Sequence, residues 1–205
     1  MPDWPTPKLK SLPPLSLYVH FPWCLKKCPY CDFNSHELRT GESRVPEEEY
    51  VAALIQDLES ALQDVWGRRL SSVFLGGGTP SLFSAGAMDA VLTAVRTLLP
   101  LEHFAEVTLE ANPGTFEAQK FADFRKAGIN RLSIGIQSFN PQHLKALGRA
   151  HDDQEAHRAV DIALKYFDNI NLDLMYALPG QTLEHAQMDI ETACSRGVTH
   201  ISAYH

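Results

Sequence analysis

The chain has 205 residues, of which 44% are hydrophobic and 21% charged, and this is enough apolar material for one sizeable hydrophobic core. Its net charge of -7 argues against nonspecific nucleic-acid binding, which depends on clustered Lys and Arg. No apolar run approaches the length of a membrane span, and residues 1–14 lack the apolar core of a signal peptide. We therefore expect a cytoplasmic protein with an extended arm over residues 1–14 and one core domain over residues 15–205.

Six short segments rich in branched apolar residues predict β-strands. In chain order they are residues 15–21, 72–75, 105–111, 131–138, 169–178 and 200–204. Because helical patterns separate them, these segments predict parallel strands that are buried on both faces. The alternation favours an α/β fold, and we expect a partial parallel (β/α)6 barrel with right-handed crossovers.

Helix-capping residues mark the starts of the helices between these strands. The expected starts are Pro46, Ser84, Thr115, Asn140, Asp152 and Thr182. Asp152 with Glu155 has the pattern of a capping box. The last helix would place Leu183, Ala186, Ile190 and Cys194 on one core-facing stripe. No helix follows the sixth strand, so we expect the sequence to be truncated within that strand.

Three of the four cysteines, Cys24, Cys28 and Cys31, lie within eight residues in the spacing C-x3-C-x2-C. In a reducing compartment this spacing indicates metal binding or catalysis rather than a disulfide framework. Three thiolates can hold three corners of a [4Fe–4S] cluster and leave one iron for a ligand that is not protein. A zinc site completed by His20 or His36 is the alternative.

Further residues capable of chemistry gather where the predicted strands end. In parallel α/β barrels the active site lies at the carboxyl ends of the strands. Asp173 interrupts an apolar segment, and a buried carboxylate must be paired or functional. By contrast, we expect His151, His157 and His185, which lie on helices or at helix starts, to face solvent.

Five motifs in one order carry a family resemblance: HFPWCLKKCPYC, GGGTP, EANPG, GIQSF and DLMYALPGQT. Together they resemble the radical S-adenosylmethionine (SAM) superfamily. More narrowly, they resemble the oxygen-independent coproporphyrinogen III oxidase family and its haem-chaperone branch. The resemblance covers about residues 15–205 and implies a [4Fe–4S] cluster, SAM and one-electron chemistry.

The resemblance also implies roles for individual residues. Cys24, Cys28 and Cys31 match the cluster ligands, with SAM on the open iron, and no catalytic residue is assigned. In the glycine turn, backbone N–H groups are expected to point at a carboxylate. The positions that match contacts to SAM or a neighbouring cofactor are Tyr18, Tyr30, Gly77, Gly78, Thr79, Glu110, Gln137, Arg149 and Asp173.

One position separates the two branches of the family. The oxidases extend the motif to a fourth cysteine, C-x3-C-x2-C-x-C, whereas this chain has Phe33 there. This difference favours the haem-chaperone branch. Membership of that branch implies haem or porphyrin as bound cargo, and haem-accepting proteins and an electron donor as partners. It leaves open whether the protein contacts a membrane-bound acceptor. The alternative is an oxidase that forms protoporphyrinogen IX by radical decarboxylation. A zinc-stabilised binding module is the remote alternative.

Overall fold

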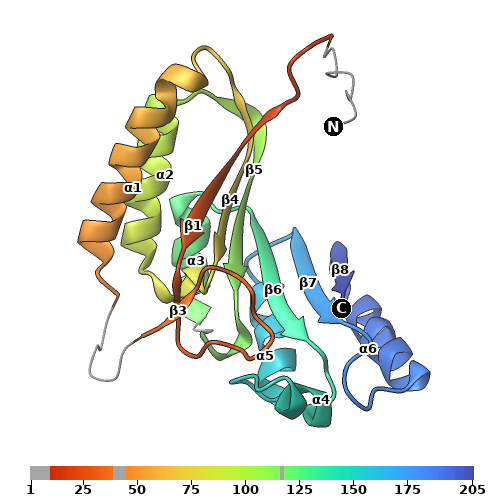
Figure 1. Cartoon of the computed structure of the whole chain (residues 1–205). Helices are drawn as coiled ribbons and strands as arrows, with labels where there is room; N and C mark the ends of the chain where they lie inside the picture. Colours follow the sequence, from red (N-terminus) through yellow and green to blue (C-terminus); the bar gives the residue numbers. More distant parts are fainter. Residues whose placement is uncertain (1–9, 39–44, 116–117) are drawn as a thin grey trace, which may run out of the picture.

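A computed structural model of the chain describes residues 10–38, 45–115 and 118–205 (Figure 1). Most of the expected N-terminal arm lies outside the described residues, and so does the side chain of Thr115, the expected cap of the third helix. The fold and the candidate site are therefore built from the three described segments.

A single six-stranded sheet forms the centre of the molecule, and every neighbouring pair of its strands is parallel. The strand order is β1-β4-β5-β6-β7-β8. The bounds are β1 Leu15–Phe21, β4 Leu70–Gly77, β5 Leu101–Ala111, β6 Arg131–Gln137, β7 Ile170–Met175 and β8 His200–Tyr204. All six predicted strands and the α/β class are confirmed. β4 and β5 begin earlier than predicted, because Leu70 pairs with both Leu15 and Leu101 and so extends the backbone ladder.

Helices connect the strands and pack along the sheet, with successive helices α1, α2 and α3 in contact with one another (Figure 1). The helices are α1 Glu47–Ala61, α2 Ala85–Leu98, α3 Ala118–Ala127, α4 Pro141–Ala146, α5 Asp153–Ala163 and α6 Leu183–Ser195, with short 3-10 turns at Leu62–Asp64, Pro80–Leu82 and Pro113–Thr115. The predicted side-chain caps Ser84, Asn140, Asp152 and Thr182 each accept a hydrogen bond from a backbone N–H of the first turn. The capping box of α5 is complete, with Glu155 as its second member.

The orientation predicted for α6 is wrong. Cys194 is exposed, and Leu183 and Ile190 on the same stripe are 71% and 44% exposed. The buried face instead carries Asp189 and Ala193. Two hydrogen bonds of 2.7 Å, from the Ser138 hydroxyl and from a backbone N–H in the same loop, reach the Asp189 carboxylate and fix this orientation.

Aromatic side chains support the end of β1, where the cysteine loop begins. Trp23 packs edge-on against Tyr50 with ring centroids 4.7 Å apart, and Phe21 packs edge-on against Phe83 at 4.8 Å. Two short parallel strands, β2 Trp23–Cys24 and β3 His36–Glu37, then close the loop at its base. The cysteine loop is therefore anchored to the core at both of its ends.

Candidate cofactor site

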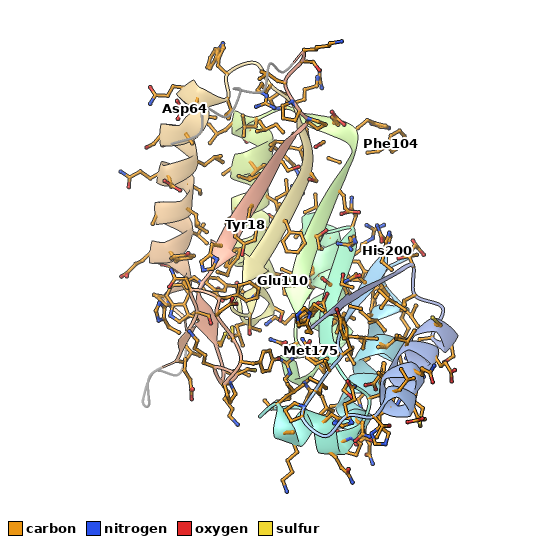
Figure 2. The ribbon with its side chains drawn as sticks, turned by 45° about the vertical axis from the view of Figure 1, so that its right-hand side comes forward. Tyr18, Asp64, Phe104, Glu110, Met175 and His200 are labelled. Atoms are coloured by element: carbon orange, nitrogen blue, oxygen red, sulfur yellow. The ribbon has the colours of Figure 1, made fainter. Side chains whose placement is uncertain are left out.

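A cavity of about 570 Å³ opens where the strands end. Eleven of the twelve residues predicted for the cofactor site line it: Cys24, Cys28, Tyr30, Cys31, Gly77, Gly78, Thr79, Glu110, Gln137, Arg149 and Asp173. Figure 2 shows Glu110 and Met175, which also lines the cavity, toward the carboxyl ends of the strands, with Phe104 at the opposite end. A cavity of this size suits a ligand as large as a nucleoside.

The cysteine loop forms one wall of this cavity. Cys24 is buried, and Cys28 and Cys31 are half-buried. Burial raises the pKa of the Cys24 thiol, hydrogen bonds with the hydroxyls of Thr79 and Ser35 lower it, and the negative charges of the other two cysteines raise it. The three sulfur atoms therefore lie close enough to influence one another.

The glycine turn after β4 packs against the cysteine loop. The N–H of Gly78 donates to the carbonyl of Phe21 at 2.7 Å, and the N–H of Thr79 donates to the carbonyl of Trp23 at 2.7 Å. A methyl group at Gly78 would lie 2.6 Å from the same Trp23 oxygen and 3.0 Å from the sulfur of Cys24. These N–H groups have protein acceptors, contrary to the expectation that they face a ligand. The glycines are required here because the two loops approach so closely.

Glu110, near the end of β5, also holds this turn. Its carboxylate accepts a hydrogen bond of 2.8 Å from the N–H of Gly77, whose φ of 117° lies in the region that favours glycine. Burial raises the pKa of Glu110 to about 7, the Gly77 hydrogen bond opposes the rise, and the charge of Asp173 adds to it. The cavity therefore contains a carboxyl group that titrates near neutral pH.

Asp173 lies on β7 and is paired, as the sequence predicted for a carboxylate in an apolar strand. It accepts hydrogen bonds from the Ser133 hydroxyl at 3.1 Å and from the amide of Asn171 at 2.7 Å. Burial raises the pKa of Asp173 to about 6, although these two hydrogen bonds lower it. The two polar partners could not be predicted, because each is an ordinary strand residue until the register is known.

Arg149, on the loop before α5, connects the cysteine loop to the sheet. One terminal nitrogen of its guanidinium donates to the Cys28 sulfur at 3.5 Å and to the Tyr30 hydroxyl at 3.3 Å. The other donates to the side-chain oxygen of Asn112 at 2.6 Å and to the carbonyl of Gly135 at 2.7 Å. The buried Nε atom has no hydrogen-bond partner within the described residues. Arg149 thus places a positive charge beside a cluster-ligand candidate, and this charge also lowers the pKa of Asp173 against the larger effect of burial.

Gln137 ends β6 in an unusual backbone conformation. Its φ is 68°, a left-handed value that is costly for a residue other than glycine. The pairing of β6 with β7 is irregular at this point. Tyr204 of β8 donates a hydrogen bond to its side-chain oxygen. Tyr204, which was not among the predicted site residues, also lines the cavity.

Tyr18 and three histidines near the site have different outcomes: the role of Tyr18 stays a prediction, and the expectation for the histidines is corrected. Tyr18 is 55% exposed and lies outside the cavity lining, with its hydroxyl 3.2 Å from a ring nitrogen of His20. His151, expected to face solvent, is 5% exposed and bonds through Nε2 to the carbonyl of Ile136 at 3.2 Å. His157 and His185 are half-buried, because one stacks on an aromatic ring and the other contacts a buried histidine.

The donor set of the cavity fits an iron–sulfur cluster, because three cysteine thiols line it. Within the described residues, no group of three or more His, Cys, Asp or Glu side chains is arranged to hold one ion. A structural zinc site needs four ligands around one centre, whereas a cubane cluster binds each thiolate through a different iron. Three cysteines that line one cavity match the second arrangement.

Comparison with known proteins identifies the class. The sequence model of the radical SAM superfamily matches residues 18–193, and the chain belongs to this superfamily. Membership implies a [4Fe–4S] cluster and SAM as cofactors. Among the solved structures, coproporphyrinogen III oxidase (HemN) from Escherichia coli, a radical SAM enzyme, superposes with a TM-score of 0.81 and 29% identity, over 93% of this chain and 44% of that one.

More similar relatives are heme chaperones named HemW. The protein from Escherichia coli (strain K12) is 52% identical over 195 residues, which are 95% of this chain and 51% of that protein. The Haemophilus influenzae protein is 49% identical over 201 residues, 96% of this chain and 52% of that protein. This chain therefore spans about half the length of the curated relatives it matches.

The structure also bears on membrane association. In the segments that the structure covers, each helix is too short or too polar to cross a bilayer.

Proposed function

We propose that this chain is the cluster- and SAM-binding part of a haem chaperone, a protein that binds haem and delivers it to haem proteins. Its partners are then haem or porphyrin, haem-accepting proteins and an electron donor, in the cytoplasm. Residues 15–205 form the core domain that holds both cofactors.

One observation carries the cofactor assignment. The three cysteines of a single loop line the same cavity as two carboxyl groups, Glu110 and Asp173, and a guanidinium, Arg149. SAM carries a sulfonium and an ammonium as well as a carboxylate, so it needs acidic and basic partners in one pocket beside the cluster. When bound, the cluster and SAM supply one-electron chemistry that no protein side chain offers.

Each cavity residue then has a task that its chemistry allows. Cys24, Cys28 and Cys31 hold the cluster. The two carboxylates favour the positive groups of SAM, and Glu110 accepts from a ribose hydroxyl. Gln137 contributes its amide, and Tyr30 covers the adenine. Arg149 keeps the cysteine loop at a fixed distance from the sheet, because it bonds to Cys28 of the loop and to the carbonyl of Gly135 in β6.

The haem assignment rests on the relatives named heme chaperone HemW and on Phe33 at the position where the oxidases have a fourth cysteine. Phe33 lines the cavity and is 58% exposed, so it offers an apolar ring where the oxidases have a thiol.

Anaerobic reconstitution with iron and sulfide tests the cofactors. We expect four irons and four sulfides per chain, and SAM binding that perturbs the electron paramagnetic resonance spectrum of the reduced cluster. A colourless protein containing one zinc ion would contradict the proposal. Haem titration of the protein at its natural length, followed by transfer to an apo haem protein, tests the chaperone function.

An oxygen-independent coproporphyrinogen III oxidase is the second candidate, and the fold similarity to HemN favours it. The two functions give opposite results when the protein at its natural length is incubated anaerobically with coproporphyrinogen III, SAM and a reductant. A chaperone leaves the porphyrinogen unchanged, whereas release of carbon dioxide and formation of protoporphyrinogen would establish the oxidase.

A further inference from the structure

A buried hydroxyl lies between two of the cluster-ligand candidates. Ser35 is 1% exposed, and its Oγ lies 3.7 Å from the sulfur of Cys31. The same side chain lies close enough to Cys24 to act on its thiol. Ser35 stands four residues after the last cysteine of the motif, so nothing in the cysteine spacing draws attention to it. One serine therefore contacts the first and the third cysteine of the motif.

Lys27 holds Ser35 in this place. Its ammonium donates hydrogen bonds to the carbonyl oxygen of Ser35 at 3.0 Å and to that of Phe33 at 3.2 Å. Its backbone N–H donates to the carboxylate of Glu37 at 3.3 Å. Because Lys27 precedes Cys28 and its acceptors follow Cys31, these bonds tie the first half of the loop to the second half. Charge-assisted hydrogen bonds of this kind are stronger than neutral ones.

The second cysteine of the motif, Cys28, has a different partner. Cys28 receives its hydrogen bond from Arg149, which belongs to another part of the chain, the loop before α5. Ser35 and Lys27 therefore act on Cys24 and Cys31 and leave the contact to Cys28 in place.

We propose that Ser35, held by Lys27, is a positioning residue of the cluster site. It brings Cys24 and Cys31 together before the cluster arrives, and its hydroxyl donates a hydrogen bond to a ligand sulfur afterwards. The inference rests on the cluster assignment proposed above. Groups that hydrogen-bond to metal ligands commonly alter metal affinity by about 10-fold to 100-fold, and hydrogen bonds to cluster sulfurs raise the reduction potential.

Ser35→Ala tests the hydroxyl. After anaerobic reconstitution, we expect the variant to lose iron to a chelator about 10-fold faster than the parent chain and to have a lower midpoint potential. Ser35→Thr, which keeps a hydroxyl, should restore both properties. Ser60→Ala is the matched control, because Ser60 is exposed on α1 and its hydroxyl donates to a carbonyl of the same helix. Unchanged iron loss and potential in Ser35→Ala would overturn the proposal.

Lys27→Met tests the clamp in the cluster-free protein. The N–H of Ser35 donates to the Phe33 carbonyl, and the N–H of His36 donates to the Pro22 carbonyl, both at 2.7 Å. We expect these two amides to exchange hydrogen faster in Lys27→Met, and iron loss after reconstitution to be faster too. Lys26→Met removes the same charge from the same loop and should change neither amide.

Equal exchange in Lys27→Met and the parent chain would overturn the role of Lys27. If the parent chain loads a cluster and both Ser35→Ala and Lys27→Met behave like the parent chain, the inference is wrong and the proposed function is unaffected. A parent chain that loads no cluster would overturn the proposed function together with the inference.

Discussion

Glu110→Gln should stabilise the ligand-free chain and weaken its affinity for a cationic ligand. In the folded chain Glu110 has a pKa of about 7 instead of the ordinary 4.5, chiefly because it is buried. Between pH 4.5 and 7, Glu110 therefore keeps its proton in the folded state, whereas in the unfolded state it has lost that proton. The free energy of unfolding must fall over this interval and stay reduced above pH 7.

The size of the effect follows from the two pKa values. At about 1.4 kcal/mol for each pH unit, ionised Glu110 destabilises the folded chain by about 3 kcal/mol above pH 7. Glutamine has nearly the same shape, stays neutral and still offers an oxygen to the Gly77 N–H. We expect Glu110→Gln to be more stable than the parent chain by about 2 to 3 kcal/mol at pH 8.5, and by less than about 1 kcal/mol at pH 5.

Urea unfolding of the cluster-free, reduced protein at both pH values measures this difference. Glu59→Gln on the exposed surface of α1 is the control, and we expect it to follow the parent chain. An advantage of Glu110→Gln that does not grow between pH 5 and pH 8.5 would refute the reasoning. In the reconstituted protein the same variant should bind SAM about 10-fold more weakly, because a charged acceptor is lost.

Three further comparisons test the site. Cys28→Ala should prevent stable cluster loading, measured as iron per chain. Cys194→Ala should load normally, because that thiol is exposed on α6. Cluster loss in Cys194→Ala would contradict the assignment of Cys194 as a residue outside the cluster site. Asp173→Asn should keep the cluster but bind SAM more weakly at pH 8, where the carboxyl with a pKa of about 6 is ionised, and unchanged affinity in equilibrium binding would remove it from the ligand contacts. In a denaturation assay, Gly78→Ala should lose about 1 to 3 kcal/mol of unfolding free energy, because its methyl group would lie 2.6 Å from a carbonyl oxygen. Gly86→Ala in α2 has room for a methyl group and should be neutral or stabilising in the same assay.

Local patterns predicted the fold because strand length and helix caps are encoded within a few residues. The capping box of Asp152 and Glu155 is an example, since both of its hydrogen bonds lie within one turn. The orientation of α6 could not be predicted in this way. Its apolar stripe suggested one buried face, but the carboxylate of Asp189 bonds to groups about 50 positions earlier in the chain and turns another face inward.

In the candidate site, too, features encoded by local sequence could be predicted and features that depend on distant contacts could not. Motif resemblance located the cysteines and most of the cavity residues, which come together because parallel strands end at one edge of the sheet. Ser133, Asn171 and Tyr204 were missed because their roles depend on strand register and on neighbours across the sheet. Ser35 and Lys27 were missed because a hydroxyl and an ammonium within a loop have no periodic pattern.

The packing of Trp23 makes it a natural optical reporter. This indole is held by Tyr50 and Phe83 and adjoins Cys24, so a strongly absorbing cluster in the loop must quench its fluorescence by energy transfer. Trp66 is 84% exposed and lies in the turn before β4, at the end of the sheet away from the loop. Replacing Trp66 with Phe would lower the background, so that cofactor arrival can be followed in real time from the emission of an unlabelled protein.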